Sequence, residues 1–405
     1  MGALGFAVIR DKQGLMQVTL KRGTAPPELF DLFGGLPRES VVMVEGKVLE
    51  NPKAKVGAEV MATAAKVLSR AETPLPLGVV DKVGVELDTR LSHRIIDLRK
   101  RDVQDVMEMR GVLLEGLRKT FMGLGFTEVE TPKILKQGAE GGSTMFALDY
   151  FGEKAFLAQS PQLYKQMLMA TDLERVFEIA PAFRAEPSDT VRHMTEFTSV
   201  DAEMAYIDGP EDLWEIVEKL IKGTLDHAAT ELKRTGNQLA KNIPPVKLPF
   251  PRIPFGKAME MLGNPADEDM SSENEKALGE IMSKEGGNDF YFITEFPSAL
   301  KRSTFYAMRQ DANPEKTHYF DLDYKGLELI SGGQREHRID KVVSQIRNAG
   351  LDPANFGSYL EAFRYGMPPH GGFAMGLDRL AFRLTGLTNI REVRLFPRDR
   401  FRLEP

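Results

Sequence analysis

The amino-acid sequence predicts a protein of the α+β class, with a β-barrel at its N-terminus and a larger domain in which a mainly antiparallel sheet is flanked by helices. Three observations support this prediction. Short segments of alternating apolar and polar residues fill roughly the first 70 residues. Two long segments further along carry apolar residues at helical spacing, and strand-like segments lie between and after them. This mixture of elements is typical of the α+β arrangement.

The N-terminal segments predict a compact barrel. Strands are expected at residues 6–14, 15–20, 41–49 and 58–68, with Gly14 in the turn of the first hairpin and a short helix near 27–33. Several short strands with one small helix favour an OB-fold, which is a barrel of five strands. Because four strands are visible, the first strand of the barrel is predicted to be missing. We therefore assign residues 1–72 to a truncated OB-fold domain.

The rest of the chain is predicted to form a linker and one large domain. Residues 73–100 are expected to begin as a stiff linker, because each proline of Thr73-Pro-Leu-Pro-Leu-Gly78 fixes φ. Residues 101–405 are assigned to the large domain, with an insertion near 234–290 that is rich first in proline and then in acidic residues. Helices are expected at 103–124, 210–233 and 377–385, and strands at 126–130, 155–158, 177–186, 196–206, 291–296, 317–324 and 327–331. A glycine-rich turn is expected before the last helix.

The composition of the chain excludes several classes of protein. It contains no cysteine among its 405 residues, which excludes disulfides, thiolate zinc sites and cysteine nucleophiles. The net charge of −6 argues against indiscriminate nucleic-acid binding, although a local basic surface is compatible with it. No apolar run is long enough to span a membrane, and the N-terminal apolar stretch is too short for a signal peptide. Together these features predict a cytoplasmic protein without a membrane partner.

The first pattern that carries chemistry joins Arg184, Glu186 and Phe197. Arg184 and Glu186 are two residues apart on a strand-like segment, so their side chains share a face. The planar guanidinium suits a phosphate, and the carboxylate suits the amino group of a base, on which Phe197 would stack. A cross-strand salt bridge beside a core phenylalanine is the alternative interpretation of the same residues.

A second pattern is the glycine-rich segment 371–379, which ends in Arg379. Glycines let the backbone approach a ligand, and the N-terminus of the following helix favours an anion. Arg379 is placed to lie over a planar base or to bind phosphate. The spacing matches neither a dinucleotide-binding fingerprint nor a P-loop, and a plain helix entry turn is the alternative.

Two further segments carry polar side chains at short spacing. Glu328 and Ser331 offer hard oxygen ligands that suit Mg²⁺ on a phosphate, and Arg335 follows two glycines and can receive a carboxylate. Residues 159–165 place a serine, glutamines and a lysine on a turn into a helix. A strand that ends in a glycine turn and an ordinary helix cap at Ser160 would explain the same two segments without a ligand.

Along the chain the four patterns follow one another as 159–165, 183–197, 328–335 and 371–379. Together they resemble the class II aminoacyl-tRNA synthetases and, within them, the aspartyl branch of archaeal and eukaryotic type. Residues 125–132 resemble motif 1, which lies at the dimer interface in that family. Motif 2 is matched by residues 183–197 and motif 3 by residues 376–379, and the similarity covers essentially the whole chain. The segments that narrow the resemblance to aspartate are 140–142, 159–165 and 331–335.

The resemblance implies an enzyme that activates L-aspartate with ATP and Mg²⁺ and transfers it to tRNA(Asp), working as a homodimer through motif 1. The catalytic residues it implies are Arg184, Glu328 and Arg335. Those expected around ATP are Arg184, Ala185, Glu186, Arg192, His193, Met194, Phe197, Glu328, Gly376, Leu377, Asp378 and Arg379. Those expected around aspartate are Glu140, Ser160, Gln162, Leu163, Tyr164, Lys165, Arg184, Asp201, Ser331 and Arg335. Glu328 and Ser331 are the implied magnesium ligands, and Phe6, Gln17 and Lys55 match positions that contact the anticodon.

The choice of aspartate depends on Lys165 and Arg335, which the resemblance places around the side-chain carboxylate. Asparagine would leave both buried charges uncompensated, and such a mismatch discriminates by about 10⁴–10⁵. The nearest rival is an asparaginyl-tRNA synthetase, but an amide needs an acceptor as well as donors. Two more distant candidates are an aspartate-to-asparagine ligase, which is a paralogue that lacks the barrel, and a catalytically silent relative that binds RNA.

Overall fold

A computed structural model describes residues 4–80, 83–137, 145–185, 187, 190–285 and 287–404. The chain divides into two compact units, Met1–Val83 and Gly84–Pro405. Each unit has its own hydrophobic core and is described by itself. The proposed boundaries at residues 72 and 100 and the insertion near 234–290 stay predictions.

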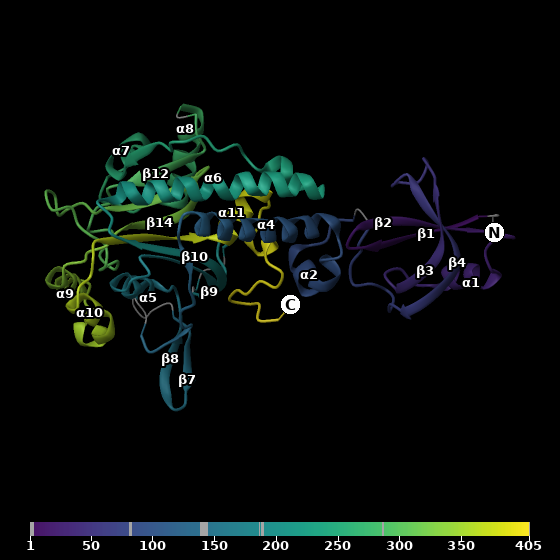
Figure 1. The fold of residues 1–405 in the computed structure, drawn as a ribbon, viewed down its shortest axis with the longest axis horizontal. Coiled ribbons are helices and arrows are strands. Elements are labelled where there is room, and N and C mark those ends of the chain that lie inside the picture. The colour runs from purple at the N-terminus through teal and green to yellow at the C-terminus, as the bar shows by residue number, and fades with distance from the viewer. Residues whose placement is uncertain are drawn as a thin grey trace. The chain divides into compact units, whose positions relative to one another are not determined.

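The first unit is a strongly bent four-stranded sheet with one helix (Figure 1). Its elements are β1 (Leu4–Asp11), β2 (Gly14–Lys21), α1 (Pro27–Gly35), β3 (Val41–Glu50) and β4 (Ala58–Ser69). The strand order is β1-β2-β4-β3, in which only the β2/β4 pair is parallel. Val18, Leu20, Leu29 and Ala62 form the core beneath the helix. The predicted OB-fold is confirmed, and the described part of this unit holds four of the five strands of such a barrel.

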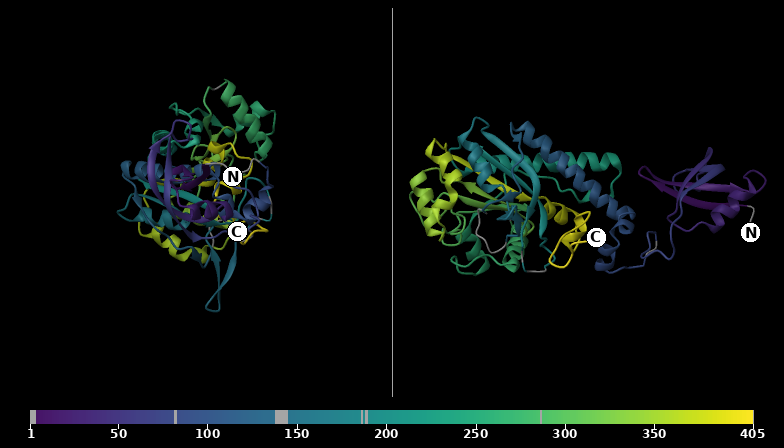
Figure 2. Two further views of the ribbon diagram at one scale, coloured as in Figure 1. Left: turned by 90° about the vertical axis from the view of Figure 1, so that its right-hand side faces the viewer. Right: turned by 90° about the horizontal axis from the view of Figure 1, so that it is seen from below.

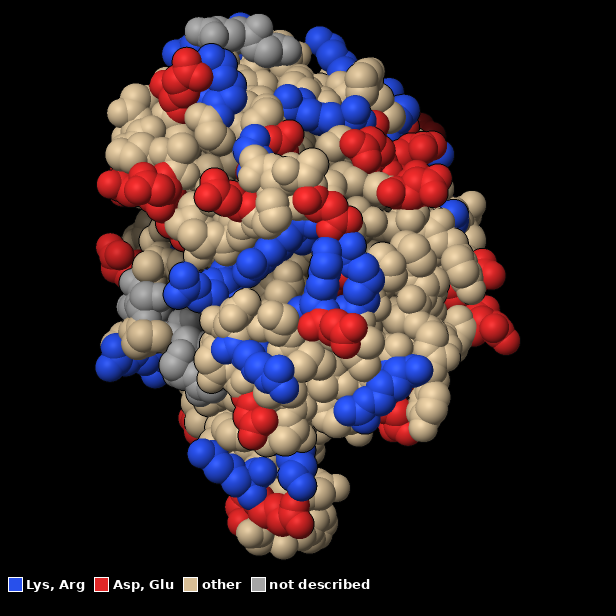
Figure 3. Space-filling model, turned by 90° about the vertical axis from the view of Figure 1, so that its left-hand side faces the viewer, with Lys and Arg blue, Asp and Glu red and all other residues tan. Residues whose placement is uncertain are grey.

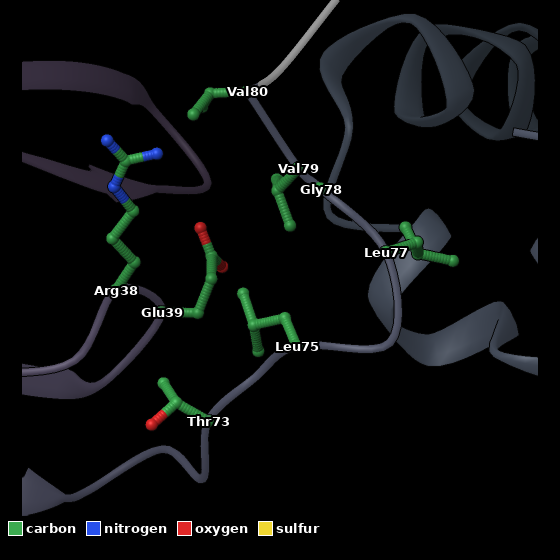
Figure 4. A pocket seen from close by; sticks show the side chains of 8 residues that line it. All are labelled: Arg38, Glu39, Thr73, Leu75, Leu77, Gly78, Val79 and Val80. Carbon is green, nitrogen blue, oxygen red and sulfur yellow. The ribbon is translucent and has the colours of Figure 1, made fainter. Parts of the chain in front are cut away.

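A pocket of about 280 Å³ lies inside this first unit (Figure 4). It lies between Arg38 and Glu39, which precede β3, and the segment 73–80, which follows β4. Glu39, one of its lining residues, has a positive φ of 67° and forms an ion pair with Arg10 at 2.6 Å. The other lining residues are Arg38, Thr73, Leu75, Leu77, Gly78, Val79 and Val80. None of the eight residues that line it belongs to the predicted site.

The second unit is built on an eight-stranded sheet of order β11-β12-β13-β14-β15-β10-β9-β5. The strands are β5 (Thr127–Glu128), β9 (Arg175–Phe183), β10 (Glu196–Ala205), β11 (Arg252–Pro254), β12 (Phe290–Thr294), β13 (Tyr319–Tyr324), β14 (Glu328–Gln334) and β15 (His370–Gly376). The pairs from β12 to β9 are antiparallel, and the two outermost pairs, β11/β12 and β5/β9, are parallel. The predicted α+β class with an antiparallel sheet is therefore confirmed.

Two long helices, α4 (Arg101–Gly123) and α6 (Pro210–Thr235), lie side by side along the sheet (Figures 1 and 2). Both follow from apolar residues at helical spacing, and α6 ends at Gly236 in the left-handed conformation, as glycine after a helix allows. Their buried faces join alternate residues of β10, such as Val200 and Ala202, in the main core. The same alternation sends the polar residues of β10 to the opposite face of the sheet.

Strand β15 occupies the segment where the sequence predicts a glycine-rich turn. It pairs with β10 on one side and β14 on the other, at the centre of the sheet. Its glycines allow a close approach, because a Cβ atom at Gly372 would lie 2.0 Å from Oε2 of Glu203 and 2.2 Å from the carbonyl oxygen of Ala202. Gly376 then precedes α11 (Leu377–Thr385), a helix with the bounds that the sequence predicts.

The remaining elements surround this sheet. A three-stranded sheet of order β6-β8-β7 projects from the body of the second unit (Figure 1). Its strands are β6 (Ile134–Leu135), β7 (Ala147–Tyr150) and β8 (Glu153–Leu157), and the other helices used below are α5 (Gln162–Met167), α7 (Phe255–Leu262), α8 (Ser272–Glu285), α9 (Ile339–Asn348) and α10 (Gly357–Arg364). Helices α7 and α8 pack with β12 on a small core that includes Phe255, Leu278 and Tyr291. In the part of the chain that the structure describes, no helix is long and apolar enough to cross a membrane.

Candidate active site

The polar face of β10 forms the floor of the candidate site. Val200, Ala202 and Met204 enter the main core, so Asp201 and Glu203 point to the other face. Both carboxylates are buried, with 2% and 0% of their surface exposed. Charges buried to this extent need partners, and two cations supply them.

Lys165, on α5, is the first of these cations. Its ammonium lies 3.0 Å from Oδ1 of Asp201 and 3.4 Å from Oε2 of Glu203, and it donates to the carbonyl oxygen of Phe373 at 3.0 Å. Only 3% of the side chain is exposed. The predicted residues Lys165 and Asp201 are therefore in direct contact, although 36 positions separate them in the chain.

Arg335, at the end of β14, is the second cation. It donates to both carboxylate oxygens of Glu203, from Nε at 2.8 Å and from Nη2 at 3.2 Å, and its guanidinium lies over the ring of Tyr306. Burial alone would raise the pKa of Glu203, but the attraction of Arg335 and Lys165 outweighs burial and lowers it. The two predicted cations thus meet at one carboxylate, which the sequence did not identify.

The other residues predicted around the amino acid have mixed surroundings. Gln162 is buried and hydrogen-bonded to Gln166. The hydroxyl of Ser160 accepts from the backbone N–H of Gln162 at 3.4 Å, but the N-cap of α5 is Pro161. Leu163 packs against a second apolar core, and Tyr164 is half-buried. Glu140 lies outside the described residues.

The residues predicted around ATP gather beside β9 and β10. The guanidinium of Arg184 lies over the ring of Phe197 with 5.2 Å to its centroid. Arg379, in the first turn of α11, donates to the backbone oxygen of Glu328 at 3.0 Å and to its carboxylate at 3.1 Å. Nδ1 of His193 lies 2.6 Å from the hydroxyl of Thr190. The contact of Arg379 with Glu328 joins motif 3 to β14, and the other two contacts lie within motif 2.

Of the residues predicted around ATP, three have side chains that support the fold, and a fourth lies outside the described residues. Met194 and Leu377 are buried in the main core. Asp378 accepts from the backbone N–H of Thr198 at 2.7 Å and pairs with Arg110, with 2% of its surface exposed. Their side chains are committed to the fold, so contact with a nucleotide at these positions would use main-chain atoms, as at Ala185 and Gly376. Glu186 lies outside the described residues.

An acidic subsite adjoins Arg379, and it contains a residue that sequence reasoning missed. The hydroxyl of Ser331 donates to Oδ1 of Asp321 at 2.5 Å, from the facing position on the neighbouring strand β13. Burial and the repulsion of Glu328 raise the pKa of Asp321 to about 6, despite the nearby ammonium of Lys301. Alternation along β13 places Asp321 and Asp323 on one face, and this was the signal available in the sequence.

Two carboxylates and a hydroxyl suit a hard divalent cation. No group of three or more histidine, cysteine, aspartate or glutamate side chains is gathered for a metal among the described residues. The set Asp321, Glu328 and Ser331 nevertheless fits Mg²⁺, because its oxygens are crowded and a cation would relieve the repulsion that raises the pKa of Asp321.

Glu275, on α8, is a second carboxylate that the sequence did not identify. It pairs with Arg192 at 3.4 Å, and burial together with the repulsion of Glu328 raises its pKa to about 7. Close packing holds α8 there, because a Cβ atom at Gly326 would lie 2.5 Å from the carbonyl oxygen of Glu275. The predicted phosphate-binding Arg192 therefore has an acidic partner.

Two surfaces outside this site bear on nucleic-acid binding. In the barrel, Phe6 is 63% exposed and Lys55 is exposed, while the amide of Gln17 donates to Glu59 at 2.8 Å. On the face of the second unit that lies at the left in Figure 1, lysine and arginine side chains gather in a band (Figure 3). A local basic surface therefore exists despite the net charge of −6.

Phe197, Asp201 and Glu203 alternate along β10, so the arginine over the phenylalanine and the two buried cations lie along one face of the sheet, an arrangement that suits an enzyme joining an amino acid to a nucleotide. The profile described as tRNA synthetases class II (D, K and N) matches residues 86–400, and the chain belongs to this family. The resemblance inferred from the sequence motifs is thereby confirmed.

Relatives place the chain more narrowly within that family. It is 47% identical to the "Aspartate--tRNA(Asp) ligase" of Pyrococcus horikoshii, over the whole of this chain and 93% of that protein. It is 44% identical to the "Aspartate--tRNA(Asp/Asn) ligase" of Methanopyrus kandleri, with the same coverage. Among solved structures, the asparaginyl-tRNA synthetase of P. horikoshii complexed with asparaginyl-adenylate is similar, with a TM-score of 0.92 and 30% identity over this whole chain and 93% of that one.

Proposed function

We propose that this enzyme activates L-aspartate with ATP and transfers the aspartyl group to the 3′ end of tRNA(Asp). The observation that carries the proposal is the shared contact of Lys165 and Arg335 with Glu203. Arg335 gives Glu203 one N–H from Nε and one from Nη2, so the other three N–H groups of its guanidinium can bind a second carboxylate, which the side chain of aspartate supplies. Asp201, beside Lys165, is the matching acceptor for the α-ammonium.

In the first step an oxygen of the α-carboxylate attacks the α-phosphorus of ATP. The new carboxyl–phosphate bond forms as the bond to the β-phosphate oxygen breaks, and pyrophosphate leaves with the bonding electron pair. Both reactants are anions, so cationic side chains must hold them together, and we assign this role to Arg184 and Arg379. Mg²⁺, when held by Asp321, Glu328 and Ser331, would neutralise phosphate charge.

In the second step a ribose hydroxyl of the terminal adenosine of the tRNA attacks the activated carbonyl, and AMP leaves. The barrel supplies the second contact with the tRNA, through Phe6 as a stacking platform and Lys55 as a cation. Gln17 faces Glu59 in the unbound protein, so it would exchange that partner for a base.

Asparagine is the competing substrate, because a solved relative with 30% identity carries asparaginyl-adenylate in its name. Because the fold is shared with that relative, it cannot distinguish aspartate from asparagine, and we assign the distinction to the side chains around the substrate. An asparagine amide would direct N–H donors toward Lys165 or Arg335, which are donors only.

Isotope exchange between pyrophosphate and ATP tests this proposal. Exchange should depend on L-aspartate, and kcat/KM for asparagine should be lower by about 10⁴-fold. Charging of tRNA(Asp) and tRNA(Asn) transcripts then measures the tRNA specificity. Equal or faster exchange with asparagine would overturn the choice of substrate, and formation of free asparagine from aspartate would favour an aspartate-to-asparagine ligase.

A homodimer through residues 125–132 is part of the same proposal. In the part of the chain that the structure describes, strand β5 of this segment pairs with β9 alone, so it is an edge of the eight-stranded sheet. Both of its residues are exposed in the single chain, and edge strands are usually covered. Light scattering at concentrations used for the assay should give twice the mass of the chain, and a monomer that retains activity would exclude the dimer.

A further inference from the structure

A chain of buried polar groups lies directly behind the amino-acid subsite. Nε2 of Gln162 donates to Oε1 of Gln166 at 2.9 Å, one turn further along α5. The amide nitrogen of Gln166 lies 3.1 Å from Nε2 of His370, the first residue of β15. The other ring nitrogen of His370, Nδ1, lies 2.9 Å from the carbonyl oxygen of Pro368. Gln166 and His370 are both 0% exposed.

The carbonyl group of Pro368 determines which group donates and which accepts in each hydrogen bond of this buried polar series. A carbonyl oxygen only accepts, so Nδ1 of His370 must carry the proton. Burial lowers the pKa of His370 to about 4, although Glu203 opposes this, so the ring is neutral and Nε2 is an acceptor. Arg335 and His337 also disfavour the charged ring. Gln166 must therefore present its NH₂ group to His370.

The orientation of Gln166 then fixes the orientation of Gln162. With its nitrogen toward His370, Gln166 presents Oε1 to Gln162, and the hydroxyl of Tyr359 donates to the same oxygen at 3.4 Å. An oxygen in that place requires a donor, so Gln162 must turn its own NH₂ group inward. The oxygen of the Gln162 amide, Oε1, is then left to face the substrate.

We propose that Gln166 and His370 are positioning residues that hold the carbonyl oxygen of Gln162 toward the α-ammonium of the amino acid. This inference rests on the proposed function and deepens it, because it makes recognition of the amino group depend on the buried hydrogen bonds that join His370, Gln166 and Gln162. We call these three residues the relay. An ammonium has three donors and no acceptor, so only the oxygen end of the amide is complementary to it. The reversed amide would place donors against donors.

The relay also resists reversal. Rotation of Gln166 would set its oxygen against the lone pair of His370 and its NH₂ group against that of Gln162. Both contacts would leave buried polar atoms without partners, which is strongly unfavourable in an interior. The orientation of Gln162 is therefore set before substrate arrives, and no reorganisation is needed on binding.

Two substitutions of Gln166 separate positioning from a purely structural role. Gln166→Leu removes the acceptor for Gln162, and we expect the KM for aspartate in pyrophosphate exchange to rise about tenfold while the KM for ATP changes less than about twofold. Gln166→Glu keeps an acceptor toward Gln162 and can accept a hydrogen bond from Nε2 of His370 when that atom carries a proton. Its KM for aspartate should stay within about threefold of the wild-type value. Gln166→Met repeats the test if the leucine variant does not fold.

A structural role predicts the opposite order of the two variants. A buried apolar residue would then be tolerated better than a buried carboxylate, so Gln166→Leu would keep the wild-type KM and Gln166→Glu would lose it. That order overturns the proposal. The matched control is Gln345→Leu, since Gln345 is buried on α9 and donates to the carbonyl oxygen of Ala307 at 3.1 Å. It should lower the melting temperature without changing the KM for aspartate.

Inhibition by L-malate provides a second readout. Malate keeps both carboxylates of aspartate and has, in place of the ammonium, a hydroxyl that can either donate or accept, so it tolerates either orientation of the Gln162 amide. Gln166→Leu should leave the inhibition constant of malate within about threefold while the KM for aspartate rises about tenfold. If malate inhibition and aspartate binding were weakened equally, the proposed role of the relay would be wrong. Wild-type exchange that fails with aspartate would instead refute the proposed function.

Discussion

Arg335 donates two hydrogen bonds to Glu203, at 2.8 and 3.2 Å, and both side chains are almost completely buried. The residues are 132 positions apart in the sequence, with Arg335 directly after β14 and Glu203 on β10. The pair fixes the guanidinium in the candidate site, because Arg335 cannot swing away without leaving a buried carboxylate behind. The orientation of the substrate-binding cation is thus a property of the folded sheet.

Neutralising Glu203 should destabilise the whole second unit. Glu203→Gln leaves the charges of Arg335 and Lys165 buried with less compensation, so the free energy of unfolding should fall by about 3–5 kcal/mol. Urea denaturation followed by circular dichroism measures this. The control is Glu215→Gln, an exposed partner of Lys219 on α6, which should change stability by less than about 0.5 kcal/mol. Equal effects of the two substitutions would contradict the role of the buried pair.

Removing Arg335 should separate aspartate binding from ATP binding. Arg335→Ala should reduce kcat/KM for aspartate in pyrophosphate exchange by about a thousandfold or more, because the side-chain carboxylate loses a bidentate partner. ATP binding, measured by calorimetry, should stay nearly unchanged, since Arg184 and Arg379 are untouched. Arg347→Ala, at an exposed position of α9, is the control. Normal exchange by Arg335→Ala would refute the assignment of the side-chain subsite.

The sequence predicts the local elements well. The bounds of α11 and the start of α6 at Pro210 agree with the structure, because helical periodicity and a terminal glycine act over a few residues. The bounds of the four barrel strands agree with the predicted ones to within three residues, and the starts of β3 and β4 agree without any difference. Such features depend on neighbours in the chain, which a sequence displays directly.

Contacts between segments that are distant in the sequence were harder to predict. Position 372 requires glycine because Glu203 and Ala202 lie against it, and no local pattern distinguishes that requirement from a turn. Asp321 and Glu275 join the site through strand register and helix packing, which periodicity does not specify. Lys165 and Arg335 were predicted through the family resemblance, and Glu203, which holds them together, was not.

Asp321 should make magnesium binding depend on pH. Its pKa of about 6 in the metal-free protein means that a proton competes with the cation, so the half-saturating Mg²⁺ concentration should fall as pH rises from about 5 to 7 and then level off. Asp321→Asn should abolish this dependence and raise the required Mg²⁺ concentration about tenfold. Exchange rates across a magnesium titration at several pH values measure both effects. Unchanged behaviour of the variant would remove Asp321 from the metal site.

Glu275 should reduce stability at neutral and alkaline pH. Its pKa is raised from 4.5 to about 7 in the folded protein, so the folded state binds more protons than the unfolded state between these values. Its contribution to stability is therefore greatest below pH 4.5 and is lost as pH rises to about 7. Glu275→Gln should raise the free energy of unfolding at pH 8 by up to about 3 kcal/mol and should have little effect at about pH 4.

The measurement for Glu275 is thermal melting of the metal-free and nucleotide-free protein at the two pH values. The control is Glu280→Gln, which alters an exposed residue on the same helix. In addition, Arg192 loses its acidic partner in Glu275→Gln, so the KM for ATP should fall. A KM for ATP that rises instead would show that Glu275 assists nucleotide binding rather than competing with it.

Phe6 should affect charging of tRNA without affecting activation of aspartate. It is 63% exposed on β1, and stacking of a base on such a ring contributes about 1–3 kcal/mol. Phe6→Ala should therefore lower kcat/KM for aminoacylation by about tenfold or more while pyrophosphate exchange, which needs no tRNA, keeps its wild-type rate. Val48→Ala, on β3 of the same barrel and equally exposed at 63%, is the control for loss of apolar surface. If both variants charge tRNA(Asp) as the wild-type protein does, the exposed ring of Phe6 does not contribute to tRNA binding, and contact of the barrel with the anticodon would have to come from Gln17 and Lys55.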